Sequence, residues 1–494
     1  MESVTVRVVW FKRDLRVTDH GPLYHAARQG PVAPLYVAEP EYWAQPDAGE
    51  RRWGFVRETL QELDQTLSKL GQPLWFMHDS MINVLEYLKD RFGVFELYSH
   101  QETGVQWCNR RNQIVREWCR RNGVLWREWP VCGVLRRATA AERWQAAWKD
   151  FMAQTRYPSP KSLPMLGTSP LKPEAWPETI GADPTPCVLR QAGGRAAAAQ
   201  ELKSFLQTRG INYFRDTHYP ATSFEGGSRL SPYLSHGVIS LREAVQQSRR
   251  ALQIYHTHRS ADWVKSMTEF LSRLYLRSHY MQQMEDEPGM ESINLHKSFN
   301  GLREHQFDEA KFEAWKNGET GFPLIDAAMK ALINYGWINY QLRGLLMSFA
   351  ANQLWLHWRE PALHMARLST DYDPAVHFPL TQQFAGTTGM FEQKIYNPVT
   401  ESHRLDPAGK FIRAECSALR EVSDAYLHAP WKMPHAEQIM SGCVLGQDYP
   451  MPIINNEDAS LIAGQRLKAH LEERLDPMET ARVRAAHLRS IKLD

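Results

Sequence analysis

The chain has 494 residues, which is too long for one ordinary hydrophobic core and favours two domains joined by a linker. Hydrophobic residues make up 43% of it and charged residues 23%, a balance typical of a soluble globular protein. The formal net charge is only +2, so overall charge does not indicate a nucleic-acid partner, and any basic surface must be local.

The N-terminal segment MESVTVRVVWFKRDLR predicts a buried strand. Lys12 and Arg13 interrupt its apolar run and no small-residue cleavage site follows, so the segment is not typical of a signal peptide. No stretch of the chain approaches the roughly 20 apolar residues that a membrane-spanning helix needs. We therefore expect a cytoplasmic protein without a membrane partner.

Short apolar runs alternate with amphipathic stretches from the first residue to about residue 130. The predicted strands are Val4–Trp10, Val32–Val37, Leu74–Met77, Phe95–Ser99 and Leu125–Trp129, and helices are predicted over 51–69 and 104–122. This alternation indicates a parallel, doubly wound sheet, which binds ligands beyond the carboxyl ends of its strands. Neither GxGxxG after the first strand nor GxxxxGK(S/T) occurs, so ordinary NAD or P-loop chemistry is not supported.

A proline-rich segment separates this region from the rest of the chain. Residues 157–186 hold eight prolines in thirty residues, which predicts a linker without regular helix or strand. After it, residues 195–435 have a nearly continuous helical pattern rich in aromatic side chains, and one more amphipathic helix is predicted over 457–475.

The segment GGSRLSPYLSHGVIS, residues 226–240, combines a turn with anion-binding groups. Its glycines permit a tight turn, Ser228 and Ser231 offer hydroxyls, and Arg229 offers a forked cation just before a helical pattern. Such groups suit a phosphate or diphosphate, although an ordinary serine-capped helix explains the same residues.

A second candidate site involves Arg343, which lies in an otherwise apolar helix. A buried guanidinium is unfavourable unless it is paired, and the acids of DYDPAVHFP, residues 371–379, are available if they face inward. We therefore expect an ion pair between Arg343 and Asp371. The alternatives are a solvent-facing arginine and a metal at the two acids, for which no nearby ligand set is complete.

Two tryptophans follow Arg343 in the same region. Trp355 and Trp358 are three residues apart and are expected on one face of a helix that begins near Gly336. They either fill the core or take part in electron transfer.

Five motifs together carry a resemblance to a known family. In chain order they are WFKRDLRVTDHGPL, GGSRLSPYLSHGVIS, ETGFPLIDAAMKAL with GWIN and LRG, DYD, and IYNPVTESHRLDPAGKFI. The chain resembles the DNA photolyase/cryptochrome family from about residue 5 to 455. The resemblance implies an α/β N-terminal antenna domain (a Rossmann-like parallel sheet) and an all-α C-terminal FAD-binding domain. On this basis the antenna domain spans 1–135, the linker 136–195 and the helical domain 196–494.

The resemblance also implies where FAD binds, in a U-shaped conformation within the helical domain. The residues that match its phosphate-binding stretch are Tyr213, Ser228, Arg229, Leu230 and Ser231. Those that match the surroundings of the flavin ring are the pair Arg343 and Asp371, Asp373 near the ribose and ring edge, His377 near N5, and the cavity-lining Glu269 and Arg273. Glu269, Tyr340 and Trp358 are the candidate catalytic residues, and no metal is expected.

In the repair enzymes of the family, reduced FAD excited by blue light donates an electron to a pyrimidine lesion flipped out of the duplex. An antenna chromophore of the folate or deazaflavin type often passes excitation energy to FAD. The segment SHQETGVQW, residues 99–107, lies at a suitable strand end, but nothing in it identifies a ligand.

The chain departs from the usual lesion pocket at several positions. Ser272 replaces an aromatic residue that stacks on the lesion, TQQ at 381–383 replaces WQW, and Tyr340 replaces an asparagine. Base stacking on an aromatic ring is worth roughly 1–3 kcal/mol, so these changes weaken a standard pocket unless Tyr340 or Tyr275 substitutes.

The tryptophan chain that reduces the flavin in this family is incomplete as well. Trp358 matches its middle member, whereas the proximal position falls within 381–383 and the distal one is His305. We therefore expect photoreduction to use another path, through Trp355 or Trp337.

The leading interpretation is a DNA photolyase, monomeric, with UV-damaged DNA as its partner. Local arginines that fit a phosphate-binding face are Arg215, Arg229, Arg273, Arg277 and Arg303. The main alternative is a cryptochrome-type photoreceptor without repair activity, supported by the altered lesion pocket; a flavin enzyme independent of light or a nucleotide-binding module is a third class. Lesion type, cyclobutane or 6-4, stays open.

The six cysteines indicate neither a disulfide framework nor a metal site, because none forms a CxxC pair or a zinc spacing. An iron–sulfur member of the family needs four cysteines in the helical domain, and only Cys416 and Cys443 lie there. We expect six reduced thiols.

Overall fold

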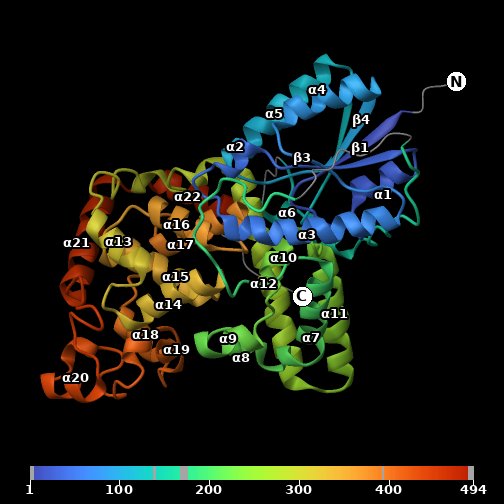
Figure 1. Ribbon diagram of the computed structural model, residues 1–494. Helices are drawn as coiled ribbons and strands as arrows, with labels where there is room; N and C mark the ends of the chain where they lie inside the picture. Colours follow the sequence, from blue (N-terminus) through green and yellow to red (C-terminus); the bar gives the residue numbers. More distant parts are fainter. Residues whose placement is uncertain (1–4, 137–140, 167–175, 392–393, 488–494) are drawn as a thin grey trace.

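The computed structural model describes residues 5–136, 141–166, 176–391 and 394–487. A parallel sheet flanked by helices forms the N-terminal part, and the remainder is helical (Figure 1). The predicted fold class is therefore confirmed. Among the described helices, none combines the length and the apolar character needed to span a bilayer.

The sheet has five parallel strands in the order β3-β2-β1-β4-β5. They are β1 (Val6–Phe11), β2 (Val32–Val37), β3 (Trp75–Met77), β4 (Phe95–His100) and β5 (Leu125–Trp129), in close agreement with the predicted runs. Helices cover both faces, with α1 (Gly21–Ala27) and α3 (Glu50–Lys69) on one side and α4 (Met81–Phe92) and α5 (Gln106–Arg121) on the other (Figure 1). This double cover explains why β2 is buried along its whole length and has no charged side chain. The short α2 (Pro40–Trp43) follows β2.

The described residues of the proline-rich segment 157–186 form no helix or strand, as predicted, but the wider span 136–195 assigned to the linker contains a helix, α6 (Ala141–Ala153). The proline-rich segment runs along the sheet domain, where Leu163 donates its backbone N–H to Leu70. Glu50 at the start of α3 accepts the backbone N–H groups of residues 180–182. These residues belong to no helix or strand, so the carboxylate provides the hydrogen bonds that regular secondary structure would otherwise supply.

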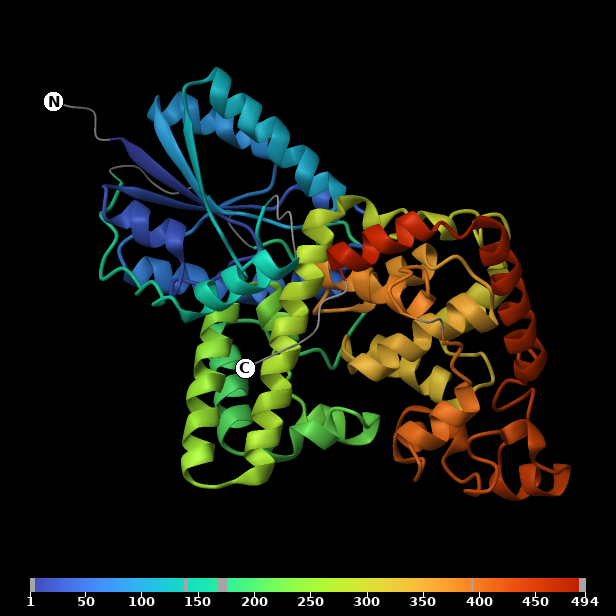
Figure 2. The same ribbon diagram turned by 180° about the vertical axis from the view of Figure 1, so that it is seen from behind.

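Helices make up the C-terminal part, and Figures 1 and 2 show α11 and α12 side by side as its longest pair. The α-helices are α7 (Arg195–Gln207), α8 (Tyr213–Asp216), α9 (Pro220–Gly226), α10 (Ser231–Ser235), α11 (Leu241–Thr257), α12 (Ala261–Asp286), α13 (Glu309–Asn317), α14 (Pro323–Tyr335), α15 (Tyr340–Ser348), α16 (Arg359–Leu368), α17 (Pro374–Ala385), α18 (Pro398–Leu405), α19 (Lys410–Glu415), α20 (His435–Ser441), α21 (Asn456–Arg474) and α22 (Pro477–His487). Single turns are η1 (Arg209–Asn212), η2 (Pro288–Glu291), η3 (Lys297–Phe299), η4 (Phe349–Gln353), η5 (Ser417–Leu419) and η6 (Pro430–Lys432).

The helix expected to carry both Trp355 and Trp358 is interrupted, so that prediction is wrong. α15 passes into the π-helical turn η4, and the chain then reverses at Trp355, whose φ is +57°. Trp358 lies just before α16 and is fully buried. Because a left-handed residue cannot continue a right-handed helix, the two indoles are not on one helical face.

Arg51 of α3 joins the sheet domain to the helical part. Its guanidinium is buried and donates to the carbonyls of Leu332 (3.2 Å), Ile333 (3.0 Å) and Leu368 (3.0 Å), which are at the ends of α14 and α16. It also donates to Pro186 in the linker at 2.8 Å. One cation thus satisfies carbonyls that helix ends leave without partners.

Candidate functional site

A cavity that is partly open to solvent lies in the helical part. Its lining residues are Tyr213, Thr217, Ser228, Ser231, Arg273, Leu276, Arg277, Tyr280, Trp337, Ile338, Asn339, Tyr340, Gln341, Arg343, Asp371, Tyr372, Asp373, Val376, His377 and Leu380. Most of the predicted FAD-binding residues therefore line one space.

Helix α12 forms one wall of this cavity. Arg273, Leu276, Arg277 and Tyr280 are three or four residues apart, so they share one helical face and all reach the lining. The same helix buries Phe270, Leu271 and Leu274 against its neighbours, which fixes the direction of the polar face.

The predicted ion pair between Arg343 and Asp371 is confirmed. Arg343 Nη2 donates to Asp371 Oδ1 at 2.8 Å, while Nε donates to the carbonyl of Ile338 at 3.1 Å and Nη1 to Ser369 Oγ at 3.3 Å. Both charged side chains are largely buried, with 13% and 8% of their surface exposed. The guanidinium is thus held in one orientation at the cavity wall, because each of its nitrogens has a partner.

Arg229 offers an unsatisfied donor next to the cavity, where it contacts the lining residue Trp337 without lining the cavity itself. Its backbone is left-handed (φ +56°), and its guanidinium stacks on Phe224 at 4.9 Å and on Trp337 at 4.2 Å. Among the described residues, the buried Nη1 has no hydrogen-bond partner. Burial lowers the pKa of Arg229 to about 10, an effect that Glu201 and Asp371 oppose. A buried cation without a partner beside the hydroxyls of Ser228 and Ser231 fits the pyrophosphate of FAD.

Leu230, like Arg229, belongs to the predicted phosphate-binding stretch but does not line the cavity. Its side chain is fully buried in the hydrophobic cluster that includes Tyr233 and Val238. Its role is to anchor the loop that holds Ser228, Arg229 and Ser231.

Asp373 is bound by arginines from both parts of the chain. Arg13, just after β1, donates to Asp373 Oδ1 at 2.7 Å, and Arg277 of α12 donates to Oδ2 at 2.5 Å. Burial alone would raise the pKa of Asp373, but Arg13 and Arg277 hold it below its usual value. Sequence reasoning did not assign a role to Arg13, although a cation at the carboxyl end of the first strand was a usable signal.

His377 has a defined tautomer at the cavity wall. Its Nε2 lies 2.8 Å from the carbonyl of Ala362, which requires Nε2 to carry the proton. Burial lowers the pKa of His377 to about 4, so the ring is neutral at physiological pH. Nδ1 therefore retains a lone pair and can only accept a hydrogen bond.

Glu269 does not line the cavity as predicted, but it is linked to the cavity-lining Tyr340 through Arg273. Glu269 pairs with Arg273 at 2.8 Å, and the Arg273 guanidinium lies 5.2 Å from the centre of the Tyr340 ring. Tyr275, the other candidate to replace the missing aromatic, is buried against Trp144 and Trp148 and cannot contact a ligand here. Tyr275 therefore does not replace the missing aromatic residue.

Three tryptophans have different environments near the cavity. Trp337 lines the cavity and donates to Ser231 Oγ at 3.0 Å. Trp358 donates to Asn294 Oδ1 at 2.7 Å and packs near Phe378. Trp355 lies between Arg303 and Arg466, whose guanidinium carbons are 4.7 and 5.2 Å from its ring.

One of the arginines that were predicted to form a phosphate-binding face, Arg303, does not lie on the surface. Arg303 is only 3% exposed and donates to Asn352 at 2.9 Å and to the carbonyl of Ala385 at 3.3 Å, so it is a core residue. Arg277 is engaged by Asp373, whereas Arg215 is exposed.

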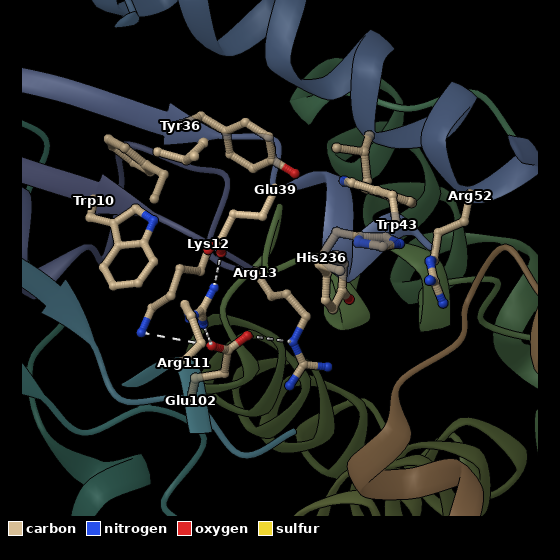
Figure 3. A pocket seen from close by; sticks show the side chains of 14 residues that line it. Trp10, Lys12, Arg13, Tyr36, Glu39, Trp43, Arg52, Glu102, Arg111 and His236 are labelled. Atoms are coloured by element: carbon tan, nitrogen blue, oxygen red, sulfur yellow. Dashed lines mark hydrogen bonds and ion pairs between the residues drawn. The ribbon is translucent and has the colours of Figure 1, made fainter. Parts of the chain in front are cut away.

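A second, smaller cavity lies beyond the carboxyl ends of β1 and β2 (Figure 3). Arg111 forms ion pairs with Glu39 and Glu102, and Glu102 also faces Arg13 at 3.7 Å. Lys12 Nζ has no hydrogen bond among the described residues, and burial lowers the pKa of Lys12. The predicted 99–107 segment contributes Glu102 to this site, where the strand order changes direction.

Asp14, His20 and His100 form a buried group that sequence reasoning did not single out. His20 Nδ1 accepts the backbone N–H of Leu23 at 3.1 Å, so its Nε2 carries the proton and donates to Asp14 at 3.0 Å. His100 Nδ1 lies 2.6 Å from the same carboxylate. This tautomer favours a hydrogen-bond network over metal ligation, which would need a lone pair on His20 Nε2.

Comparisons with known proteins are consistent with this geometry. A family model described as DNA photolyase matches residues 7–141, and one described as FAD binding domain of DNA photolyase matches 270–469. Together the two matches take up more than half of the chain.

Curated relatives include both repair enzymes and photoreceptors. A deoxyribodipyrimidine photo-lyase of Vibrio cholerae is 28% identical over 88% of this chain and 95% of its own length. A cryptochrome DASH of Synechocystis is 25% identical over 91% and 95%.

Solved structures share the fold. A class III photolyase of Agrobacterium tumefaciens matches with a TM-score of 0.80 and 22% identity, covering 96% of this chain and 98% of its own. A Synechocystis cryptochrome matches with a TM-score of 0.83 and 22% identity, covering 94% and 100%. An archaeal photolyase of Sulfolobus tokodaii, solved with two FAD molecules, matches with a TM-score of 0.74 and 24% identity, covering 94% and 100%.

Proposed function

Because the chain belongs to the DNA photolyase/cryptochrome family, we propose that it is a deoxyribodipyrimidine photolyase that repairs UV-induced pyrimidine lesions in DNA with blue light. The observation that carries this proposal is the helical-domain cavity, which is lined by Ser228, Ser231 and the Arg343–Asp371 ion pair and adjoins Arg229, whose buried Nη1 has no hydrogen-bond partner among the described residues. These are the groups that a dinucleotide cofactor with a pyrophosphate and a redox-active ring requires.

The residues that would hold FAD are distributed along this cavity. Ser228, Ser231 and Tyr213 in the lining, together with Arg229 next to it, would bind the phosphates. The residues that would surround the ring are Arg343, Asp371, Asp373, Arg273 and His377. When bound and reduced, FAD supplies the light-driven electron that splits the lesion. The cations Arg343, Arg13 and Arg277 outnumber the acids Asp371 and Asp373, so this part of the site stabilises a reduced, negatively charged cofactor.

Residues at the mouth of the cavity would receive the flipped lesion. Arg273, held by Glu269 and stacked on Tyr340, presents donors to the carbonyl oxygens of a pyrimidine. Tyr340 supplies an aromatic surface next to it. The partner proposed here is UV-damaged DNA, bound by a monomer.

A cryptochrome-type photoreceptor is the second candidate, and the mouth of the cavity favours it. Ser272 donates to the carbonyl of Thr268 at 3.1 Å and offers no stacking surface, and Thr381 and Gln382 are buried. The aromatic positions usual in repair enzymes therefore do not contact a lesion in this chain.

The cavity beyond β1 and β2 is the proposed site of an antenna chromophore of the folate or deazaflavin type. Its four basic side chains, Lys12, Arg13, Arg52 and Arg111, exceed the two acids Glu39 and Glu102, which favours an anionic chromophore. A tightly bound second chromophore would add an absorption band that flavin does not have.

The test is repair by the reduced, FAD-loaded protein under blue light, with double- and single-stranded oligonucleotides that contain cyclobutane or 6-4 lesions. We expect restoration of at least one lesion, and loss of FAD together with repair in Arg343→Ala, whose neighbour Asp371 loses its only charged partner among the described residues. Failure on every lesion, with reduced FAD bound, would favour the photoreceptor.

A further inference from the structure

Three aromatic rings form a row that begins in the wall of the helical-domain cavity. They are Tyr340 of α15, Phe384 of α17 and Tyr396, which precedes α18; we call them the aromatic row. The ring centroids of Tyr340 and Phe384 are 5.3 Å apart, and those of Phe384 and Tyr396 are 6.4 Å apart. All three are partly exposed, and of the three only Tyr340 lines the cavity, so the row extends from the cavity wall to rings outside the lining.

The aromatic row has a cation at each end. The Arg273 guanidinium lies 5.2 Å from the Tyr340 ring, and Lys394 Nζ lies 4.9 Å from the Tyr396 ring. Stacking rings combined with cations are typical of surfaces that bind single-stranded nucleic acid, where rings stack on bases and cations contact phosphates.

A glycine in α15 permits this arrangement. A Cβ at Gly344 would lie 2.3 Å from Cε1 of Phe384, closer than any real contact, so only glycine lets that ring rest on the helix beside Tyr340. Glycine inside a helix is otherwise unfavourable. Gly344 therefore lowers the stability of α15 at the position where a side chain would displace the Phe384 ring.

We propose that the aromatic row binds the bases of a single-stranded stretch of DNA that adjoins the flipped-out lesion, with no preference for base sequence. Every base has a face that can stack, so the row needs no specific hydrogen bonds to recognise a strand. The row supplies the stacking surface that Ser272 and residues 381–383 lack. This inference rests on the proposed function, which supplies DNA as the ligand and the flipped-out lesion beside the row.

The experiment measures binding in the dark of the FAD-loaded protein to two undamaged fluorescent strands, an oligothymidine and an equally long strand of abasic sites. Phe384→Ala and Tyr396→Ala should each weaken oligothymidine binding about 5- to 100-fold, the range expected for one lost stacking contact. Both should leave binding to the abasic strand within about twofold, since the cations that contact phosphates remain. Gly344→Ala, which keeps all three rings but displaces Phe384, should also weaken oligothymidine binding.

The matched control is Phe307→Ala, which removes a partly exposed phenylalanine outside the row and should leave both affinities unchanged. Retained FAD content shows that each variant is folded; if Phe384→Ala loses FAD, Tyr396→Ala alone decides. Equal losses on both strands, or no loss on oligothymidine, would overturn the proposal. If the row variants lose oligothymidine binding but the wild-type protein repairs no lesion, the photolyase proposal is refuted and the proposal for the aromatic row stands. If the wild-type protein repairs a lesion but the row variants bind oligothymidine normally, only the proposal for the aromatic row is refuted.

Discussion

Charge and hydrogen bonding at single residues determine which side chains can exchange electrons with the cofactor. Trp358 donates its indole N–H to Asn294, an acceptor that stabilises an oxidised indole. Trp355 instead lies next to the buried Arg303. At an effective dielectric constant of about 20, a unit charge at this distance raises the energy of an indole cation by about 3 kcal/mol. We therefore favour a path through Trp358, or through the cavity-lining Trp337, over one through Trp355.

This difference predicts the behaviour of two variants. Trp358→Phe should slow photoreduction of bound FAD about tenfold or more, whereas Trp355→Phe should leave its rate within about twofold. The measurement is the loss of the blue absorption band of oxidised flavin under constant illumination with an external reductant. Slowing of the same size in both variants would show that Arg303 does not control oxidation of Trp355.

At the scale of elements, the start of α15 aligns the helix that carries both Tyr340 and Arg343. Asn339 caps it by accepting the N–H of Leu342 at 3.1 Å, and its amide donates to the carbonyl of Thr217 at 3.2 Å. Asn339 thus links α15 to the segment that follows α8. The cap therefore helps to set the position of the Arg343 guanidinium relative to the cavity.

Asn339→Ala should lower the free energy of unfolding by about 1–2 kcal/mol, the usual cost of a lost cap, and should also weaken FAD binding. The control is Asn455→Ala, which removes a cap from α21 that accepts the N–H groups of Glu457 and Asp458, away from the cavity lining. It should cost a similar amount of stability and leave FAD affinity unchanged. Denaturant unfolding and FAD titration together separate the two effects, and equal FAD affinity in both variants would contradict this role of α15.

At the scale of the whole molecule, buried polar contacts hold the sheet domain against the helices. Asp19, which has a left-handed backbone (φ +55°), accepts from Ser240 at 2.6 Å and forms an ion pair with Arg242. It also accepts the backbone N–H of Tyr157 in the linker at 3.1 Å. One carboxylate therefore joins the sheet domain, the linker and the start of α11.

This contact predicts how stability depends on pH. Burial would raise the pKa of Asp19, but the hydrogen bonds from Arg242 and Ser240 lower it below 3.8. A depressed folded-state pKa means that the stabilisation is complete above the unfolded pKa, about 3.9, and is lost as pH falls through the folded value. Asp19→Asn, which also tolerates a left-handed backbone, should cost about 3–5 kcal/mol at pH 7 because it leaves Arg242 buried without its partner charge.

The measurement is unfolding by denaturant at several pH values. Below pH 4 the difference between Asp19→Asn and the wild-type protein should shrink, because the wild-type carboxylate also becomes neutral. A difference that stays constant down to pH 2 would show that the carboxylate charge is not what stabilises the domain contact.

Local patterns were sufficient for several features. The strands of the sheet were predictable because short, largely apolar runs alternate with amphipathic helical patterns along the first 130 residues. The Arg343–Asp371 pair was predictable because a cation in an apolar helix requires a carboxylate. The break between Trp355 and Trp358 was not, because a single left-handed residue leaves no periodic signal, and neither was Arg303, whose burial depends on how the surrounding helices pack.

The sequence by itself therefore determined the two-part architecture, the family and the polar residues of the cofactor cavity, all of which depend on residues close together in the chain or on motifs in a fixed order. Only the tertiary structure decided that Arg13 binds Asp373, 360 residues away, and that Phe384 rests on Gly344 beside Tyr340. The physical reason is that contacts between distant segments depend on which surfaces the packed core brings together. The local periodicity of the sequence carries no information about which distant segments meet.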